Sequence, residues 1–177
     1  MTIKEITYGG LSIALLSICS WISIPLAVPF TMQSFAVFFL CFLWGGKRGS
    51  IYVFAYILCG LLGMPVFSGF QGGVHVIFGL TGGYIVGFLL SALLLWGTQR
   101  VWSPCKKISL LFALMGLVIC YGFGTTWFLL VSQQQDSILT IGSVLMTCVV
   151  PFILPDCIKL FLAYRLAGRL RFYISAL

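Results

Sequence analysis

Charged residues are scarce in this chain of 177 residues, where Asp, Glu, Lys and Arg together make up 7%. Acids are rarest, with three against ten bases, which gives a net charge of +7. Hydrophobic residues reach 61%, and the mean hydropathy is +1.15. A soluble domain of this size cannot bury so much apolar surface. The composition therefore excludes an ordinary soluble protein and predicts one integral membrane domain, residues 1–177.

Several motifs of catalysis and metal binding are missing as well. None of the seven cysteines forms a CxxC pair, and most lie in apolar runs, so we predict no metal site, cofactor or disulfide framework. A phosphate-binding loop of the GxxxxGK[ST] type is also missing, so energy for any transport would come from a partner or a gradient. The N-terminus enters an apolar run without a small-residue cleavage site, which favours a first membrane helix over a removed signal peptide.

The apolar runs predict an all-α membrane protein with six transmembrane helices. The second and third runs are short for a span of about 20 residues, and short, Gly/Pro-interrupted segments often flank the binding site of a transporter. The last run is interrupted by Pro151 and Pro155, after which we expect a final helix from Asp156 to about Leu170. The runs cover residues 6–26, 34–44, 51–62, 84–100, 108–131 and 138–170.

The segments between the runs differ in character. Pro25 and Pro29 predict an ordered loop after the first helix. Residues 45–49, Gly-Gly-Lys-Arg-Gly, read as a helix stop and a cytoplasmic turn. Residues 63–83 are too glycine-rich for a good helix and too apolar for a solvated linker. We expect these residues to form a long lid loop between the third and fourth helices.

The positions of the bases predict the orientation in the membrane. With both termini cytoplasmic, nine of the ten bases fall on the cytoplasmic side, and Lys159 is the tenth. The bases lie at the ends of apolar runs, which fits this topology better than nucleic-acid binding. Asp156 is about 22 Å from Arg171 at the helical rise, so it is expected in the outer half of the bilayer, beneath the lid.

Asp156 and Lys159 form the most informative pair in the chain. Positions three apart share one face of a helix. Each charge costs about 2.5–3.5 kcal/mol in the middle of a membrane helix, while an exposed pair returns about 0.2–0.5 kcal/mol. One interpretation is a self-neutralising pair that joins helices. The other is a pair that faces a cavity and holds a polar ligand.

Polar and aromatic residues from the outer loops complete a candidate site around this pair: Gln33, Gln71, His75 and Tyr84. Such a mixture suits a small molecule with a polar head and an apolar body. Gln33 has the alternative role of capping a helix, and His75 that of a loop hydrogen-bonder. An intramembrane hydrolase using His75 with Ser68 or Asp156 is a further alternative, but no third group orients the base.

Four stretches resemble the signature stretches of the BioY family, biotin-binding substrate components of energy-coupling factor (ECF) transporters. The resemblance extends over nearly the whole chain, in order. The stretches are Val28-Pro-Phe-Thr-Met-Gln33, Gly60-Leu-Leu-Gly-Met-Pro-Val-Phe67, Gly79-Leu-Thr-Gly-Gly-Tyr84 and Pro155-Asp-Cys-Ile-Lys159. It implies biotin capture at the outer face of a bacterial cytoplasmic membrane, no enzymatic activity, and partnership with a transmembrane coupling subunit and two ATPases. Another vitamin is the alternative cargo.

By this resemblance, Asp156 and Lys159 take the ureido ring of biotin, and the lid closes over the ring and tail. The substrate-binding residues it implies are Asp156, Lys159, Tyr84, Gly73, Gln71, Gln33, Gly82 and Phe30. Leu80 stands where proline is expected. No base other than Lys159 is evident near the outer site for the biotin carboxylate, so backbone N–H groups of the lid or a helix start are the candidates.

Gly10 and Ala14 in the first run form a small-xxx-small pair, which permits close helix approach but is also common in membrane helices. They resemble the small-residue face that the family uses against its coupling subunit. The next position at this spacing is Ile18, which is not a small residue, so the pattern stops there.

Overall fold

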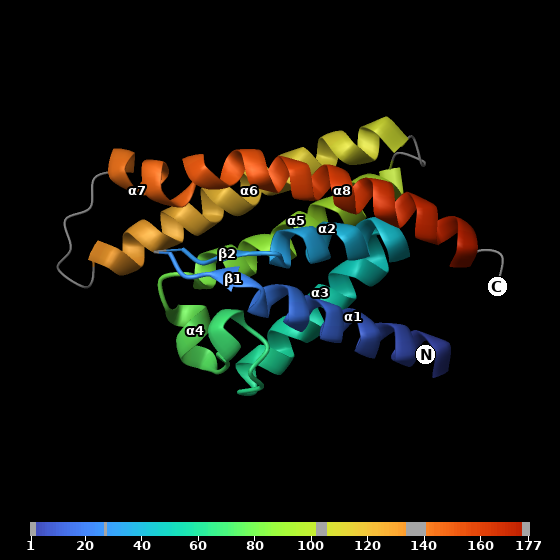
Figure 1. Cartoon of the computed structure of the whole chain (residues 1–177), viewed down its shortest axis with the longest axis horizontal. Helices are drawn as coiled ribbons and strands as arrows, with labels where there is room; N and C mark the ends of the chain where they lie inside the picture. Colours follow the sequence, from blue (N-terminus) through green and yellow to red (C-terminus); the bar gives the residue numbers. More distant parts are fainter. Residues whose placement is uncertain (1–2, 27, 102–105, 134–140, 175–177) are drawn as a thin grey trace.

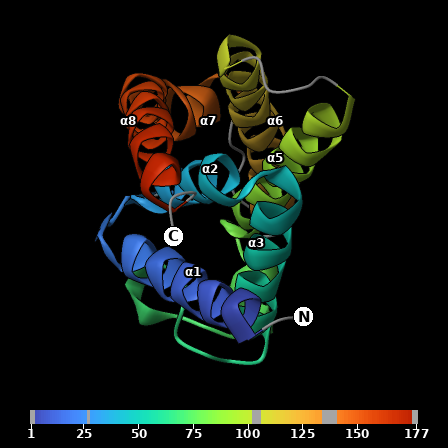
Figure 2. The same cartoon turned by 90° about the vertical axis from the view of Figure 1, so that its right-hand side faces the viewer.

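The computed structural model describes residues 3–26, 28–101, 106–133 and 141–174, which fold into a helical bundle (Figures 1 and 2). The start of α1 and the end of α8 lie at one end of the bundle, whereas the hairpin and α4 lie toward the other (Figure 1). The elements are α1 Ile3–Trp21, β1 Ser23–Ile24, β2 Phe30–Thr31, α2 Gln33–Trp44, α3 Gly46–Leu61, the 3-10 helix η1 Ser68–Phe70, α4 Val74–Phe78, α5 Gly82–Val101, α6 Lys106–Gln133, α7 Ile141–Cys148 and α8 Val150–Ile174.

Three segments of the described chain are long and apolar enough to cross a membrane: Gly82–Gln99, Ile108–Gln133 and Ile141–Phe172. The apolar helix α2 is shorter, with 12 residues. Many large apolar side chains point outward from the bundle, among them Leu11, Val118 and Leu154. A mostly helical membrane protein is thus confirmed, while the six spans predicted from the sequence remain a prediction.

The first helix ends earlier than predicted, because a β-hairpin follows it. The α1 helix stops at Trp21 rather than near residue 26, and β1 pairs antiparallel with β2, with Ser23 opposite Thr31 and Ile24 opposite Phe30. The two prolines lie in the loop of the hairpin, where a proline interrupts no helical hydrogen bond. This hairpin carries Phe30 and Thr31 toward α8.

The turn predicted over residues 45–49 is in fact much shorter. Only Gly45, with a φ of +85°, separates α2 from α3, and the helix begins at Gly46. A Cβ on Gly46 would lie 2.5 Å from Trp96 Cα, and one on Gly49 would lie 2.8 Å from Cys41 Cα. These two glycines therefore allow close helix packing instead of ending a helix.

The predicted proline break was also displaced. The turn residue Val149 separates α7 from α8, and both Pro151 and Pro155 lie within α8. Pro151 is in the first turn of α8, where a backbone N–H has no helical partner in any case. The final helix starts at Val150 rather than at Asp156, so Asp156 lies inside it, beyond its first turn.

The glycine-rich connection contains two short helices, η1 and α4, where the sequence predicted none. Its first half is fixed to the bundle, because the Val66 carbonyl accepts hydrogen bonds from Ser20 Oγ at 2.5 Å and Tyr56 OH at 2.9 Å. The Trp21 indole N–H donates to the Pro65 carbonyl at 2.9 Å. These bonds hold the segment beside the pocket described below, which several of its residues line.

Two glycines of α6 allow a matched test of the packing between α5 and α6. A Cβ on Gly124 would collide with the Tyr84 ring, whereas one on Gly122 would meet nothing within 4 Å. We expect Gly124→Ala to lower the free energy of unfolding by about 1–3 kcal/mol, the usual cost of overpacking. Gly122→Ala should leave it nearly unchanged. Thermal unfolding in detergent measures both, and equal unfolding temperatures would contradict this packing.

Candidate functional site

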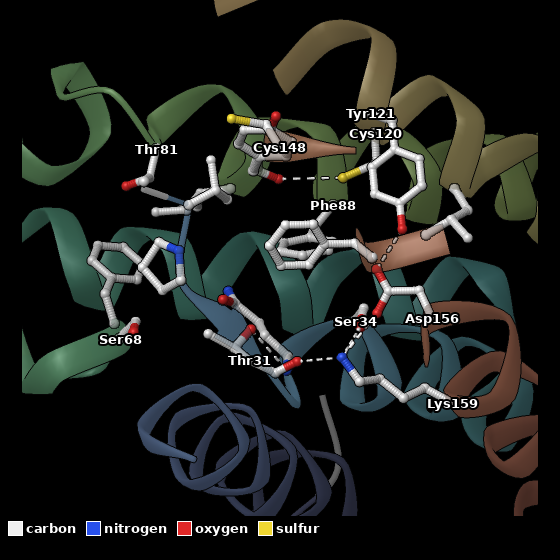
Figure 3. A pocket seen from close by; sticks show the side chains of 18 of the residues that line it. Thr31, Ser34, Ser68, Thr81, Phe88, Cys120, Tyr121, Cys148, Asp156 and Lys159 are labelled. Atoms are coloured by element: carbon white, nitrogen blue, oxygen red, sulfur yellow. Dashed lines mark hydrogen bonds and ion pairs between the residues drawn. The ribbon is translucent and has the colours of Figure 1, made fainter. Parts of the chain in front are cut away.

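A pocket lies among α2, α5, α6 and α8, between the hairpin and the glycine-rich segment (Figure 3). Including its open mouth, it holds about 780 Å³ of space. Its lining combines charged, neutral polar, thiol and aromatic side chains: Val28, Pro29, Thr31, Gln33, Ser34, Phe67, Ser68, Gln71, Val76, Thr81, Tyr84, Ile85, Phe88, Leu117, Cys120, Tyr121, Cys148, Phe152, Asp156 and Lys159.

The Asp156 carboxylate is held by three donors from three helices. Ser34 Oγ of α2 donates to Oδ1 at 2.8 Å, and Tyr121 OH of α6 donates to Oδ2 at 2.6 Å. Lys159 Nζ, one turn further along α8, lies 2.8 Å from Oδ1. A carboxylate offers about four acceptor positions, so one of these positions stays open.

The Lys159 ammonium group uses all three of its protons within the protein. It donates to the Thr31 carbonyl at 2.6 Å and to Asp156 Oδ1 at 2.8 Å, and it makes a longer contact of 3.5 Å with Ser34 Oγ. The charge also lies 3.7 Å from the centre of the Phe30 ring, a cation–π contact. The hairpin therefore supplies two of the contacts that fix this lysine.

Both members of the pair are buried, with side chains only 8% exposed. Every buried polar side-chain atom among the described residues has a hydrogen-bond partner. Removing charges from water costs several kcal/mol for each ion, which a single partner rarely returns in full. The pair faces the pocket, as Figure 3 shows, so these charges are available to a ligand as well as to each other.

The middle of the pocket is apolar and aromatic. Phe88 and Leu117 approach it from α5 and α6, and Phe152 from α8. Tyr84 also lines the pocket, with its hydroxyl 3.2 Å from Thr125 Oγ1. Such walls favour an apolar ring or chain between two polar ends.

The structure brings together five of the eight predicted substrate-binding residues on the pocket wall: Asp156, Lys159, Tyr84, Gln71 and Gln33. Gln33 is the first residue of α2, and its side-chain amide donates to Tyr56 OH at 3.2 Å, so it lines the pocket instead of acting only as a cap.

The other three predicted residues are close to the pocket but do not line it. Phe30 lies against Lys159. Gly73 has a φ of +107° and donates its N–H to the Gly60 carbonyl at 2.7 Å. Gly82 packs tightly against the backbone of Ile77. Both glycines belong to the glycine-rich connection, from which Phe67, Ser68 and Gln71 line the pocket.

Ser34 and Tyr121 were missed by sequence reasoning, although they hold the Asp156 carboxylate. Each is a single polar group within an apolar run, and only the arrangement of the helices shows which one faces Asp156. Thr81 and Ser68 likewise line the pocket. His75, in contrast, is exposed on α4 and does not line it, so the predicted hydrolase pairing of His75 with Ser68 has no support in this geometry.

Gly10 and Ala14 lie on the exposed face of α1, and neither lines the pocket. Ile18, the next position on this face, is also exposed, at 50%. A side chain added at Gly10 would meet nothing within 4 Å. This face of α1 is therefore open to a neighbouring molecule or to lipid.

The described residues form an apolar helical bundle with a buried ion pair in a pocket, the class of membrane protein with an internal polar site. Comparison with known proteins identifies the family, because the BioY family model matches residues 1–176. This chain belongs to the BioY family, whose members are transporter components rather than enzymes.

Relatives and one solved structure agree with this family. The chain is 37% identical to the biotin transporter BioY of Thermotoga maritima, covering 95% of this chain and 96% of the relative. It is 30% identical to the biotin transporter BioY of Lactococcus lactis subsp. cremoris, covering 96% and 91%. A crystal structure of the S-component for biotin from an ECF-type ABC transporter superposes with a TM-score of 0.82 at 28% identity, covering 97% and 94%.

Proposed function

We propose that this chain is the biotin-binding substrate component of an ECF transporter in the cytoplasmic membrane of a bacterium. The buried pair of Asp156 and Lys159 in a pocket with apolar walls carries the proposal, together with the names of the relatives. A transmembrane coupling subunit and two ATPase subunits supply the energy, while this chain performs no chemistry of its own.

The geometry suits the ureido ring of biotin. A ureido N–H donates to the open acceptor position on Asp156, where Tyr121 already orients Oδ2. The ureido oxygen accepts from Lys159 and replaces the contact with Ser34, which at 3.5 Å is the longest of the three. Phe88, Leu117 and Phe152 then enclose the thioether ring and the start of the chain.

The topology that we propose has six membrane segments: α1, α2, α3, α5, α6, and α7 with α8. Both termini are cytoplasmic, which places nine of the ten bases on that side. The pocket then opens outward, beneath the glycine-rich segment, and residues 63–83 act as its lid. The start of α1 and the end of α8 lie at the same end of the bundle, as two termini on one side of a membrane require (Figure 1).

Replacing either charge of the pair should weaken biotin binding strongly. We expect Asp156→Asn and Lys159→Met each to weaken binding by roughly 10- to 150-fold, because each removes a hydrogen bond to a charged group and leaves its partner unmatched. Equilibrium binding of labelled biotin to the detergent-purified chain measures the effect, with unlabelled vitamins as competitors.

Glu5→Gln serves as the matched control, because Glu5 pairs with Arg48 at 3.0 Å in an exposed ion pair. It should leave biotin affinity unchanged. Equal affinity in the wild type and both site variants would remove Asp156 and Lys159 from recognition. Absence of saturable biotin binding by the folded wild type would contradict the proposed cargo.

The exposed face with Gly10 and Ala14 is the surface that we propose for the coupling subunit. Gly10→Leu and Ala14→Leu should reduce co-purification with the coupling subunit and biotin uptake by cells, because a large side chain prevents close helix approach. Gly122→Leu is the matched control, since Gly122 is exposed on α6 with nothing near it. Biotin binding by the isolated chain should stay intact in all three, and normal uptake by the α1 variants would exclude this face.

A further inference from the structure

The two ends of the pocket differ in charge and in exposure. Asp156 and Lys159 form the inner end and are 7% and 8% exposed. Ser68 and Thr81 lie at the opposite side of the pocket, as Figure 3 shows, and both are partly exposed. Gln71, on the same glycine-rich segment, is exposed. A ligand that places its polar ring on the buried pair therefore extends its other end toward these three side chains.

The side chains at the mouth are neutral hydrogen-bonding groups. The hydroxyls of Ser68 and Thr81 and the amide of Gln71 each donate and accept, so they match a carboxylate and a carboxamide equally well. Lys159, the base among the pocket-lining residues, lies at the inner end, where it donates hydrogen bonds to Thr31, Asp156 and Ser34. A carboxylate at the mouth stays partly hydrated, and its charge contributes little there.

The mouth residues are positioned by the fixed part of the glycine-rich segment. The Phe67 N–H donates to the Gln71 carbonyl at 2.9 Å, and the Phe70 ring stacks on Trp21 with ring centres 4.8 Å apart. With Val66 held by Ser20 and Tyr56, this hairpin-like turn presents Ser68 and Gln71 at defined places. Selectivity at the mouth is thus a property of the fold and not of a free loop.

We propose that the pocket recognises the ring system of biotin and that the charge of the tail contributes little to affinity. Its substrate class then includes neutral biotin amides, in which the carboxylate carries an amine through an amide bond, and Ser68, Gln71 and Thr81 set the tolerance for the tail. This inference rests on the proposed function, because it takes the ureido ring to lie on Asp156 and Lys159.

Competition binding to the full purified chain tests the inference, with biotinamide and lipoate compared against biotin. Biotinamide keeps the ring and loses the tail charge, whereas lipoate keeps a carboxylate on an aliphatic tail and lacks the ureido ring. We expect biotinamide to bind within about fivefold of biotin and lipoate not to compete. A charge-assisted bond to the carboxylate would instead make biotinamide roughly 10- to 150-fold weaker.

The outcomes separate this inference from the proposed function. A loss greater than about fivefold for biotinamide, with biotin still tightly bound, overturns tail-charge tolerance and leaves biotin recognition in place. Failure of biotin itself to bind overturns the proposed function and this inference with it. Competition by lipoate also overturns the inference, because it shows that a carboxylate tail supports binding without the ureido ring.

A base introduced at the mouth gives an independent test. Gln71→Lys should raise the preference for biotin over biotinamide by roughly two- to fivefold, the scale of an exposed ion pair, and high salt should reduce this gain. Gln71→Met, similar in length and neutral, should leave the ratio near that of the wild type. An unchanged ratio in Gln71→Lys would show that the tail does not reach this position, which overturns the assigned mouth.

Discussion

The buried ion pair of α8 is the constraint around which the inner end of the binding pocket is arranged. Two opposite charges in an apolar bundle require polar partners, and these come from α2, α6 and the hairpin through Ser34, Tyr121 and Thr31. The elements that meet at the pair also line one side of the pocket, while α5 and the glycine-rich segment line the rest. A single local requirement, the matching of Asp156 and Lys159, fixes the inner wall of the binding site.

Small residues make this convergence possible. Gly46 and Gly49 bring α3 against α5 and α2, and Gly124 admits the ring of Tyr84 at the pocket wall. The hairpin after α1 places the Thr31 carbonyl and the Phe30 ring beside the ammonium group. The glycine-rich segment is held to the bundle by hydrogen bonds to its Pro65 and Val66 carbonyls. The pocket therefore has a defined mouth as well as a defined inner end.

The charged pair of the site could be predicted from the sequence, but the helix boundaries and the side chains that hold the pair could not. Charges are so costly in an apolar chain that Asp156 and Lys159 stood out, and the motif resemblance gave the family. Glycine and proline were misread where they lie within helices: Gly46 looked like a helix stop but packs against α5, and Pro155 looked like a break but lies inside α8. Ser34 and Tyr121 were missed because one hydroxyl in an apolar run carries no signal until three helices are placed together.

The central claim is that the pair is kept for ligand recognition and not for stability. The most direct test measures unfolding temperature and biotin affinity together in the double variant Asp156→Asn with Lys159→Met. Removing both charges leaves no unmatched ion, so we predict an unfolding temperature at or above that of the wild type, with tight biotin binding lost. A double variant that unfolds at a clearly lower temperature, or one that still binds biotin tightly, would contradict the claim.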